Sequence, residues 1–257
     1  MRADEIVLYV DFTCPWSYLA TLRAERLRAA GLHVEWRAVE HAPRRPGNPV
    51  STPTRFDRIR RDTERVLGTL LPGEPFPYSL AGFVPYTRPA VAGYAEAYVA
   101  GVAPYVARQL FDAYWLNALA LGDPKLVRTL LVEAIRSGRS SSEQGRLWGY
   151  AVDVTGAPIT AAADRLVRRW RSEWAAMTRV GVPVLVVDGG APLVGDAAVA
   201  WLGDEVLGRG LDPLADVRPE PPAPGRRVDA PTVHWATYEG HRWVRAYQDR
   251  FSLRRPA

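Results

Sequence analysis

One residue, Cys14, stands out in this 257-residue chain as a candidate for covalent chemistry, because it is the only cysteine. It follows the apolar run 6–12 and precedes an amphipathic stretch from Tyr18 to about Ala30, so we expect it where a strand gives way to a helix. Unpaired backbone N–H groups and the helix dipole favour a thiolate at a helix N-terminus, where the pKa of a free thiol can fall from about 8.5 to roughly 3.5–7.5. The sequence therefore predicts an ionised, reactive thiol at this junction.

The three residues after Cys14 complete a Cys-Pro-Trp-Ser motif. Ser17 stands where redox motifs with two thiols carry the second cysteine, so the chain cannot close a disulfide with itself. The Ser17 hydroxyl could bond the thiolate or satisfy the helix backbone. Next to Pro15, Trp16 could cover the thiol or line a substrate cleft. The alternative interpretation of Cys14 is an inert core thiol, since free cysteine is often simply buried.

Composition excludes several other function classes. The net charge is +5, but the arginines are scattered and Lys125 is the only lysine, so no basic tract indicates nucleic-acid binding. One cysteine and four histidines without ligand spacing argue against a metal site. No Gly-rich phosphate loop or dinucleotide fingerprint is present, so we expect no nucleotide cofactor.

The chain begins without the apolar region of a secretory signal, and no run of about 18 apolar residues could span a membrane. A lone thiol suits a reducing compartment. We therefore expect a cytoplasmic protein without membrane attachment.

Around the motif, the apolar pattern predicts strand, helix and strand within forty residues, which implies two parallel strands joined by a right-handed crossover. A long stretch of helical periodicity follows, with a break at Pro104. Strand signals then return, and a last helix begins at Gly195-Asp196, where we expect Asp196 to be the N-cap. The expected ranges are 6–12, 18–30 and 34–38, then 54–178 for the helices, and 182–187 with 192–194 for a hairpin.

For several other residues, the simplest interpretation is a structural role. Asp11, ahead of Cys14, is expected to form a turn, and Ser140 with Glu143 resembles a capping box. Three residues at helical spacing are expected in the core, with a roof over Cys14 as the alternative; they are Trp170, Trp174 and Met177. The Pro-rich segment 212–228 and the aromatic-rich residues after it predict an added hairpin, or a strand and a helix.

This order of elements resembles the thioredoxin-like fold of the DsbA family, which includes FrnE-like oxidoreductases, kappa-class glutathione transferases and hydroxychromene-carboxylate isomerases. The resemblance rests on residues 11–18, on Gly181-Val182-Pro183 and on Gly195-Asp196, and it covers roughly residues 5–210.

The resemblance implies an α/β fold with a large all-helical insertion and an aromatic-rich C-terminal extension. A thioredoxin-like domain would comprise residues 1–45 and 180–211. Residues 54–178 would form the helical insertion domain, and residues 212–257 the extension.

The resemblance also assigns roles to the late segments. Pro183 would be cis and face the thiol, while the backbone of Val182 would pair with an extended thiol peptide. The alternative is an edge-strand proline without a ligand role. In glutathione-using relatives a Gly-x-Asp at the last helix holds the amino-carboxylate end of the thiol. Here Gly195 and Asp196 are adjacent, which departs from that spacing.

These implications lead to a monothiol oxidoreductase or thiol transferase in which Cys14 is the nucleophile and Ser17 supports it. Glutathione or another low-molecular-weight thiol would be the external reductant, and the substrate would be a disulfide. A second hypothesis is an isomerase or transferase that holds a reduced thiol as cofactor and acts on an aromatic or quinone-like small molecule. A third is a binding protein without catalysis. The oligomeric state stays open, a homodimer being one option.

Overall fold

The computed structural model describes residues 5–41, 53–76, 78, 81–138, 157–158, 160–177 and 181–223. Its contacts divide the chain into two compact units, residues 1–225 and 226–257, and all described residues belong to the first. The predicted capping box at Ser140 and Glu143 and the aromatic part of the C-terminal extension lie outside the described residues.

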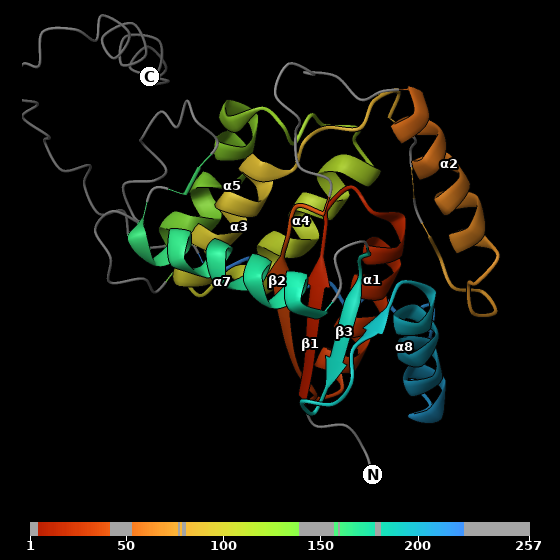
Figure 1. Ribbon diagram of the computed structural model, residues 1–257. Helices are drawn as coiled ribbons and strands as arrows, with labels where there is room; N and C mark the ends of the chain where they lie inside the picture. Colours follow the sequence, from red (N-terminus) through yellow and green to blue (C-terminus); the bar gives the residue numbers. More distant parts are fainter. Residues whose placement is uncertain are drawn as a thin grey trace, which may run out of the picture. The chain divides into compact units, whose positions relative to one another are not determined.

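A four-stranded sheet in the order β2-β1-β3-β4 forms the centre of the described fold (Figure 1). β1 (Glu5–Val10) is parallel to β2 (His33–Ala38) and antiparallel to β3 (Val184–Val187), which pairs with β4 (Leu193–Val194). The predicted parallel pair and the late hairpin are confirmed. β1 ends two residues earlier than predicted, because the chain turns at Asp11, whose main-chain oxygen accepts the N–H of Cys14 at 3.0 Å.

Seven helices occur within the described ranges. α1 (Pro15–Ala29) follows the first strand and packs against α8 (Asp196–Gly208), as Figure 1 shows. Between β2 and β3 lie the inserted helices α2 (Pro53–Leu67), α3 (Arg88–Val99), α4 (Ala103–Trp115), α5 (Pro124–Ser137) and α7 (Ala161–Met177). The break predicted near Pro104 is confirmed, since α3 ends at Val99 and α4 begins at Ala103.

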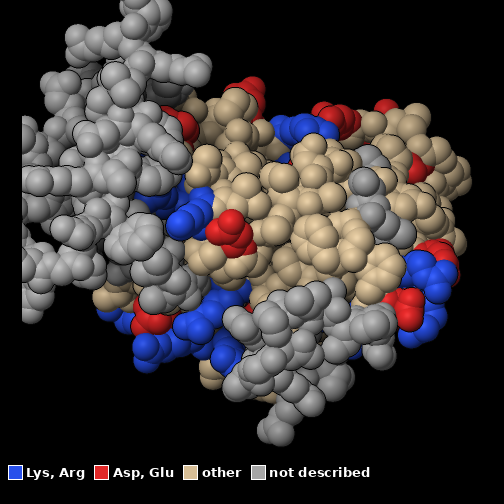
Figure 2. Space-filling model, turned by 90° about the horizontal axis from the view of Figure 1, so that it is seen from above, with Lys and Arg blue, Asp and Glu red and all other residues tan. Residues whose placement is uncertain are grey.

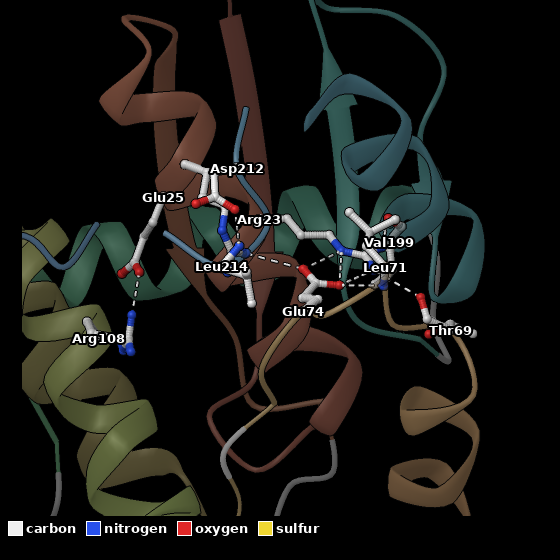
Figure 3. Close-up of polar contacts among 10 residues, drawn as sticks. Arg23, Glu25, Thr69, Leu71, Glu74, Arg108, Val199, Asp212 and Leu214 are labelled. Carbon is white, nitrogen blue, oxygen red and sulfur yellow. Dashed lines mark hydrogen bonds and ion pairs between the residues drawn. The ribbon is translucent and has the colours of Figure 1, made fainter. Parts of the chain in front are cut away.

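A buried ion network joins α1 to its neighbours (Figure 3). The guanidinium of Arg23 donates to both carboxylate oxygens of Glu74, the shortest bond being 2.6 Å, and Arg26 reaches the same carboxylate at 3.2 Å. Arg23 also donates to the main-chain oxygens of Val199 at 2.8 Å and of Thr69 at 3.0 Å. One side chain of α1 is thereby bonded to α8 and to the segment after α2.

None of the described helices is long and apolar enough to cross a membrane. The view from above in Figure 2 looks onto the side toward which β1 points in Figure 1. A broad area of uncharged residues lies there, bordered by acidic and basic side chains.

Candidate thiol site

Cys14 occupies the junction that the sequence predicts. It is the N-cap of α1, with extended backbone angles, and Pro15 takes the first helical position. The N–H of Tyr18 donates to the Cys14 main-chain oxygen at 3.1 Å, which closes the first turn. The thiol therefore projects from the N-terminal end of the helix.

The segment before β3 lies directly against this thiol. Cys14 Sγ donates to the main-chain oxygen of Val182 at 3.4 Å, and the peptide bond between Val182 and Pro183 is cis. The Nε1–H of Trp174 donates to the main-chain oxygen of Gly181 at 2.8 Å, so α7 holds the residue that precedes Val182. Two stretches that are distant in the sequence thus meet at the sulfur.

The predicted low pKa of Cys14 is wrong for this structure. Only 6% of the residue is exposed, and this burial raises the pKa of the thiol to about 12. The N–H groups of Ser17 and Trp16 and the Ser17 hydroxyl favour the thiolate, as predicted, while the charge of Asp11 opposes it. The stabilising groups of the helix terminus are present, but the loss of hydration outweighs them.

Ser17 and Trp16 surround the sulfur from the first turn of α1. Ser17 is fully buried, and its hydroxyl both favours the Cys14 thiolate and accepts the N–H of Asp11 at 3.3 Å. The backbone group that Ser17 satisfies thus belongs to the loop before α1, and not to the helix as the alternative interpretation had it. Trp16 is 7% exposed, and the guanidinium carbon of Arg65 lies 5.4 Å from its ring centre. An arginine of α2 thus covers the tryptophan beside the thiol.

The start of α8 differs from the prediction by one residue. Gly195, not Asp196, is the N-cap, with a φ of +64° that favours glycine. Asp196 is the first helical residue, and its carboxylate accepts the N–H of Ala197 at 3.0 Å. The other carboxylate oxygen lies 4.0 Å from the guanidinium of Arg65. Asp196 is therefore next to the arginine that covers Trp16.

The sequence interpretation missed a buried polar cluster beneath the thiol loop. Asp11 is fully buried, and its carboxylate accepts three bonds from hydroxyl and N–H groups of Thr13 (2.9 Å each) and Thr87 (3.3 Å). His41 adds bonds from its main-chain N–H at 3.1 Å and from Nδ1 at 2.8 Å. Burial alone would raise the pKa of Asp11, but the His41 charge and the Thr13 bonds outweigh it and lower this pKa to about 2. Asp11 is a turn-forming acid, as expected, and also an ion-pair partner.

One signal could have revealed this pair. Asp11 directly follows β1 and His41 follows β2 by three residues, and the carboxyl ends of parallel strands lie at the same edge of a sheet.

The inserted helices also hold the thiol loop. Thr87, at the start of α3, donates its hydroxyl to Asp11, as described above. Trp115 of α4 donates its Nε1–H to the main-chain oxygen of Phe12 at 3.1 Å. Trp170 and Trp174 of α7 are buried, as predicted, whereas Met177, also expected in the core, is only half-buried. Side chains of three inserted helices and their flanks therefore bond to the segments on either side of the sulfur. Among the described residues, no group of three or more His, Cys, Asp and Glu side chains could hold a metal ion.

Several solved structures share this fold. A probable DsbA oxidoreductase from Streptomyces coelicolor is 16% identical, with 80% of this chain and 90% of that chain covered and a TM-score of 0.55. DsbM, described as a cytosolic disulfide reductase from Pseudomonas aeruginosa, is also 16% identical, with 79% and 98% covered and a TM-score of 0.50, and it has been solved with GSH. A 2-hydroxychromene-2-carboxylate isomerase is 19% identical, with 80% and 95% covered and a TM-score of 0.47.

No curated protein matches the chain. The family model described as DSBA-like thioredoxin domain matches residues 5–206, which is most of the sequence. Together with the sheet order and the placement of Cys14 at the start of α1, this match shows that the chain belongs to the family of DSBA-like thioredoxin domains.

Proposed function

We propose that this chain is a monothiol oxidoreductase or thiol transferase in which Cys14 is the nucleophile and an external low-molecular-weight thiol completes the cycle. One observation carries the proposal: the Cys14 sulfur projects from the start of α1 and lies 3.4 Å from the Val182 oxygen, just before Pro183. The description of DsbM as a disulfide reductase supports the same class of reaction on this fold.

The proposed reaction needs no second protein thiol. Cys14 loses its proton and attacks one sulfur of a disulfide, whose S–S bond breaks while the other half leaves as a thiolate and takes up the proton. This step gives a mixed disulfide with Cys14. An external thiol then attacks the substrate sulfur of the mixed disulfide and releases the Cys14 thiol, which leaves that substrate half joined to the external thiol. A second external thiol frees this half, so two external thiols are oxidised to one disulfide and the substrate disulfide is reduced to two thiols. This cycle requires a reducing compartment, and we place it in the cytoplasm.

The surrounding residues take distinct roles in this proposal. The N–H groups of Trp16 and Ser17 and the Ser17 hydroxyl stabilise the thiolate as it forms, against the cost of burial. The backbone of Val182 lies at the sulfur and would align an extended thiol or disulfide. Asp196 and Arg65 present opposite charges 4.0 Å apart, which suits the amino-carboxylate end of glutathione.

The raised pKa of Cys14 favours a second candidate function. A thiol with a pKa of about 12 stays protonated at neutral pH and can donate a hydrogen bond, as it does to Val182. Such a donor could stabilise the thiolate of a bound small thiol, which would then act as cofactor for an isomerase or transferase. The substrate of this second function would be an aromatic or quinone-like small molecule.

Two variants of one residue separate these functions. Oxidised glutathione is added to the wild-type chain and the mass of the protein is measured, with Cys14→Ser as the blank. The first function predicts a glutathione adduct in the wild-type chain that reduced glutathione releases, and turnover of a different disulfide, hydroxyethyl disulfide, with reduced glutathione as the reductant. Absence of both adduct and turnover in the wild-type chain overturns it.

The second function predicts binding of reduced glutathione without turnover of disulfides. Cys14→Ser keeps a hydroxyl donor, so this binding should persist in that variant and weaken in Cys14→Ala. Equal binding by the serine and alanine variants contradicts the cofactor role. If neither the adduct nor the binding of reduced glutathione is found, the third hypothesis remains, a binding protein without catalysis.

A further inference from the structure

We propose that His41 sets the reactivity of the Cys14 thiol through Asp11, by neutralising a carboxylate charge that the sulfur would otherwise face. His41 is thus a positioning residue for the site. The inference rests on the proposed function, because it concerns how readily the same thiol ionises. It assigns a role to a pair that lies outside the Cys-Pro-Trp-Ser motif.

Asp11 is bonded to the thiol loop by its main chain. Its oxygen accepts the N–H of Cys14 at 3.0 Å, and its N–H donates to the Ser17 hydroxyl at 3.3 Å. These bonds fix the carboxylate within the same buried loop as the sulfur. Burial is the largest cause that raises the pKa of Cys14, and the negative charge of Asp11 raises it further. A neighbouring positive charge that cancels Asp11 would therefore favour the thiolate.

His41 is placed to provide that positive charge. Its Nδ1 lies 2.8 Å from the carboxylate, while the other side chains that bond Asp11, those of Thr13 and Thr87, are neutral donors. The His41 side chain is 15% exposed, whereas that of Asp11 is fully buried. The imidazole therefore lies between the buried carboxylate and the protein surface.

Other ionisable groups face Asp11 from the neighbouring elements. Burial first, and then the Asp11 charge, raise the pKa of Glu40, while Arg55 and Arg88 oppose the shift. Burial also raises the pKa of Tyr114 in α4, with Arg55 lowering it and Asp11 raising it. Both arginines act on Glu40, whereas Asp11 forms its ion pair with His41. His41 is thus the residue through which the Asp11 charge can be neutralised.

The charge at position 41 decides what the sulfur faces. A positive charge there makes the pair neutral as a whole, so the sulfur faces little net charge. A neutral side chain there leaves the Asp11 charge uncompensated, and this charge opposes ionisation of Cys14.

The test is the rate of Cys14 alkylation by iodoacetamide, a neutral reagent, measured by mass spectrometry across the pH range. His41→Gln retains a hydrogen-bond donor but no charge, and we expect it to slow alkylation about threefold to tenfold, since tenfold corresponds to about one pKa unit. Asp11→Asn should accelerate alkylation. In the Asp11→Asn background, His41→Gln should have no effect. Equal slowing in both backgrounds, or no slowing in either, overturns the proposal.

A second comparison covers the case in which Asp11→Asn does not fold. His41→Lys carries a positive charge at every pH below about 10, so it should be alkylated faster than His41→Gln. Equal rates in these two variants overturn the proposal. Alkylation needs no disulfide substrate, so this test can fail while turnover persists, and turnover can be absent while the His41 effect is found.

Discussion

Trp174 donates its Nε1–H to the main-chain oxygen of Gly181 at 2.8 Å, so the residue before Val182 is bonded to a side chain of α7. Four residues earlier on the same helix, the Nε1 of Trp170 is buried without a hydrogen-bond partner among the described residues. Both indoles are buried. The two tryptophans therefore form a natural pair for measuring what this one hydrogen bond does for the thiol site.

We expect Trp174→Phe to make Cys14 easier to alkylate. The substitution removes a hydrogen bond worth about 1 kcal/mol, which makes local opening of the segment before β3 about fivefold more frequent. The matched control is Trp170→Phe, which shortens the same type of side chain but removes no partnered donor. Iodoacetamide alkylation of both variants measures the difference. Equal alkylation rates would show that the bond does not hold Val182 against the sulfur.

The raised pKa of Cys14 predicts a loss of stability at alkaline pH. An unfolded thiol ionises near 9.0, whereas the folded thiol keeps its proton until about pH 12. Between these values the folded chain binds more protons than the unfolded chain, so the free energy of unfolding falls as pH rises, by at most about 1.4 kcal/mol per pH unit.

Cys14→Ala removes this contribution and provides the control. Urea unfolding at several pH values from 8 upward should show the wild-type chain losing stability relative to the alanine variant. A difference between the two chains that does not change with pH would mean that the folded thiol ionises as readily as the unfolded one. Such a thiol would have neither the raised pKa found here nor the lowered pKa that the sequence predicts.

The carboxylate of Glu74 should be essential for folding stability. Figure 3 shows the Glu74 carboxylate bonded to Arg23. The Glu74 side chain is fully buried and also pairs with Arg26, and both arginines are almost as buried. Glu74→Gln leaves two buried guanidinium groups without a counter-charge, and we expect a loss of about 3–5 kcal/mol in urea unfolding. The control is Glu64→Gln at an exposed pair with Arg60, where about 0–1 kcal/mol is expected. Similar losses at both positions would contradict the importance of the buried network.

The positive φ of Gly195 predicts a cost for any side chain at the start of α8. Gly195→Ala forces alanine into a left-handed conformation, and we expect a loss of about 1 kcal/mol in the free energy of unfolding. Gly208, at the end of the same helix, has open space around its missing side chain and no positive φ. Gly208→Ala should therefore be neutral or stabilise the chain by up to about 1 kcal/mol. Loss of stability in the Gly208 variant alone would contradict this account.

The elements of the fold follow from sequence pattern because their causes are local. Continuous apolar residues give β1, Pro53 and Pro124 stand in the first turns of α2 and α5, and Asp123 caps α5 by accepting the N–H of Lys125. The contact between Cys14 and Val182 is not local, and it was expected only from the family resemblance.

The environment of the thiol could not be predicted in the same way. Burial of Cys14 depends on residues packed around the loop from distant elements, and the four-residue Cys-Pro-Trp-Ser motif contains no information about them. The Asp11–His41 pair joins positions thirty residues apart, and only the shared edge of two parallel strands indicates that they meet. Asp196 was expected as an N-cap from its residue type, but the left-handed conformation of Gly195 moves the cap one position back.

The bonds from Thr87, Trp115 and Trp174 have a consequence for any attempt to simplify this protein. Each runs from the inserted helices or their flanks to Asp11, Phe12 or Gly181, which frame the sulfur. A trimmed version consisting of the sheet with α1 and α8 would keep Cys14 and Pro183 in its sequence but leave their supports behind. For this chain, a shortened version that keeps the thiol site intact must therefore include the helices from α3 to α7.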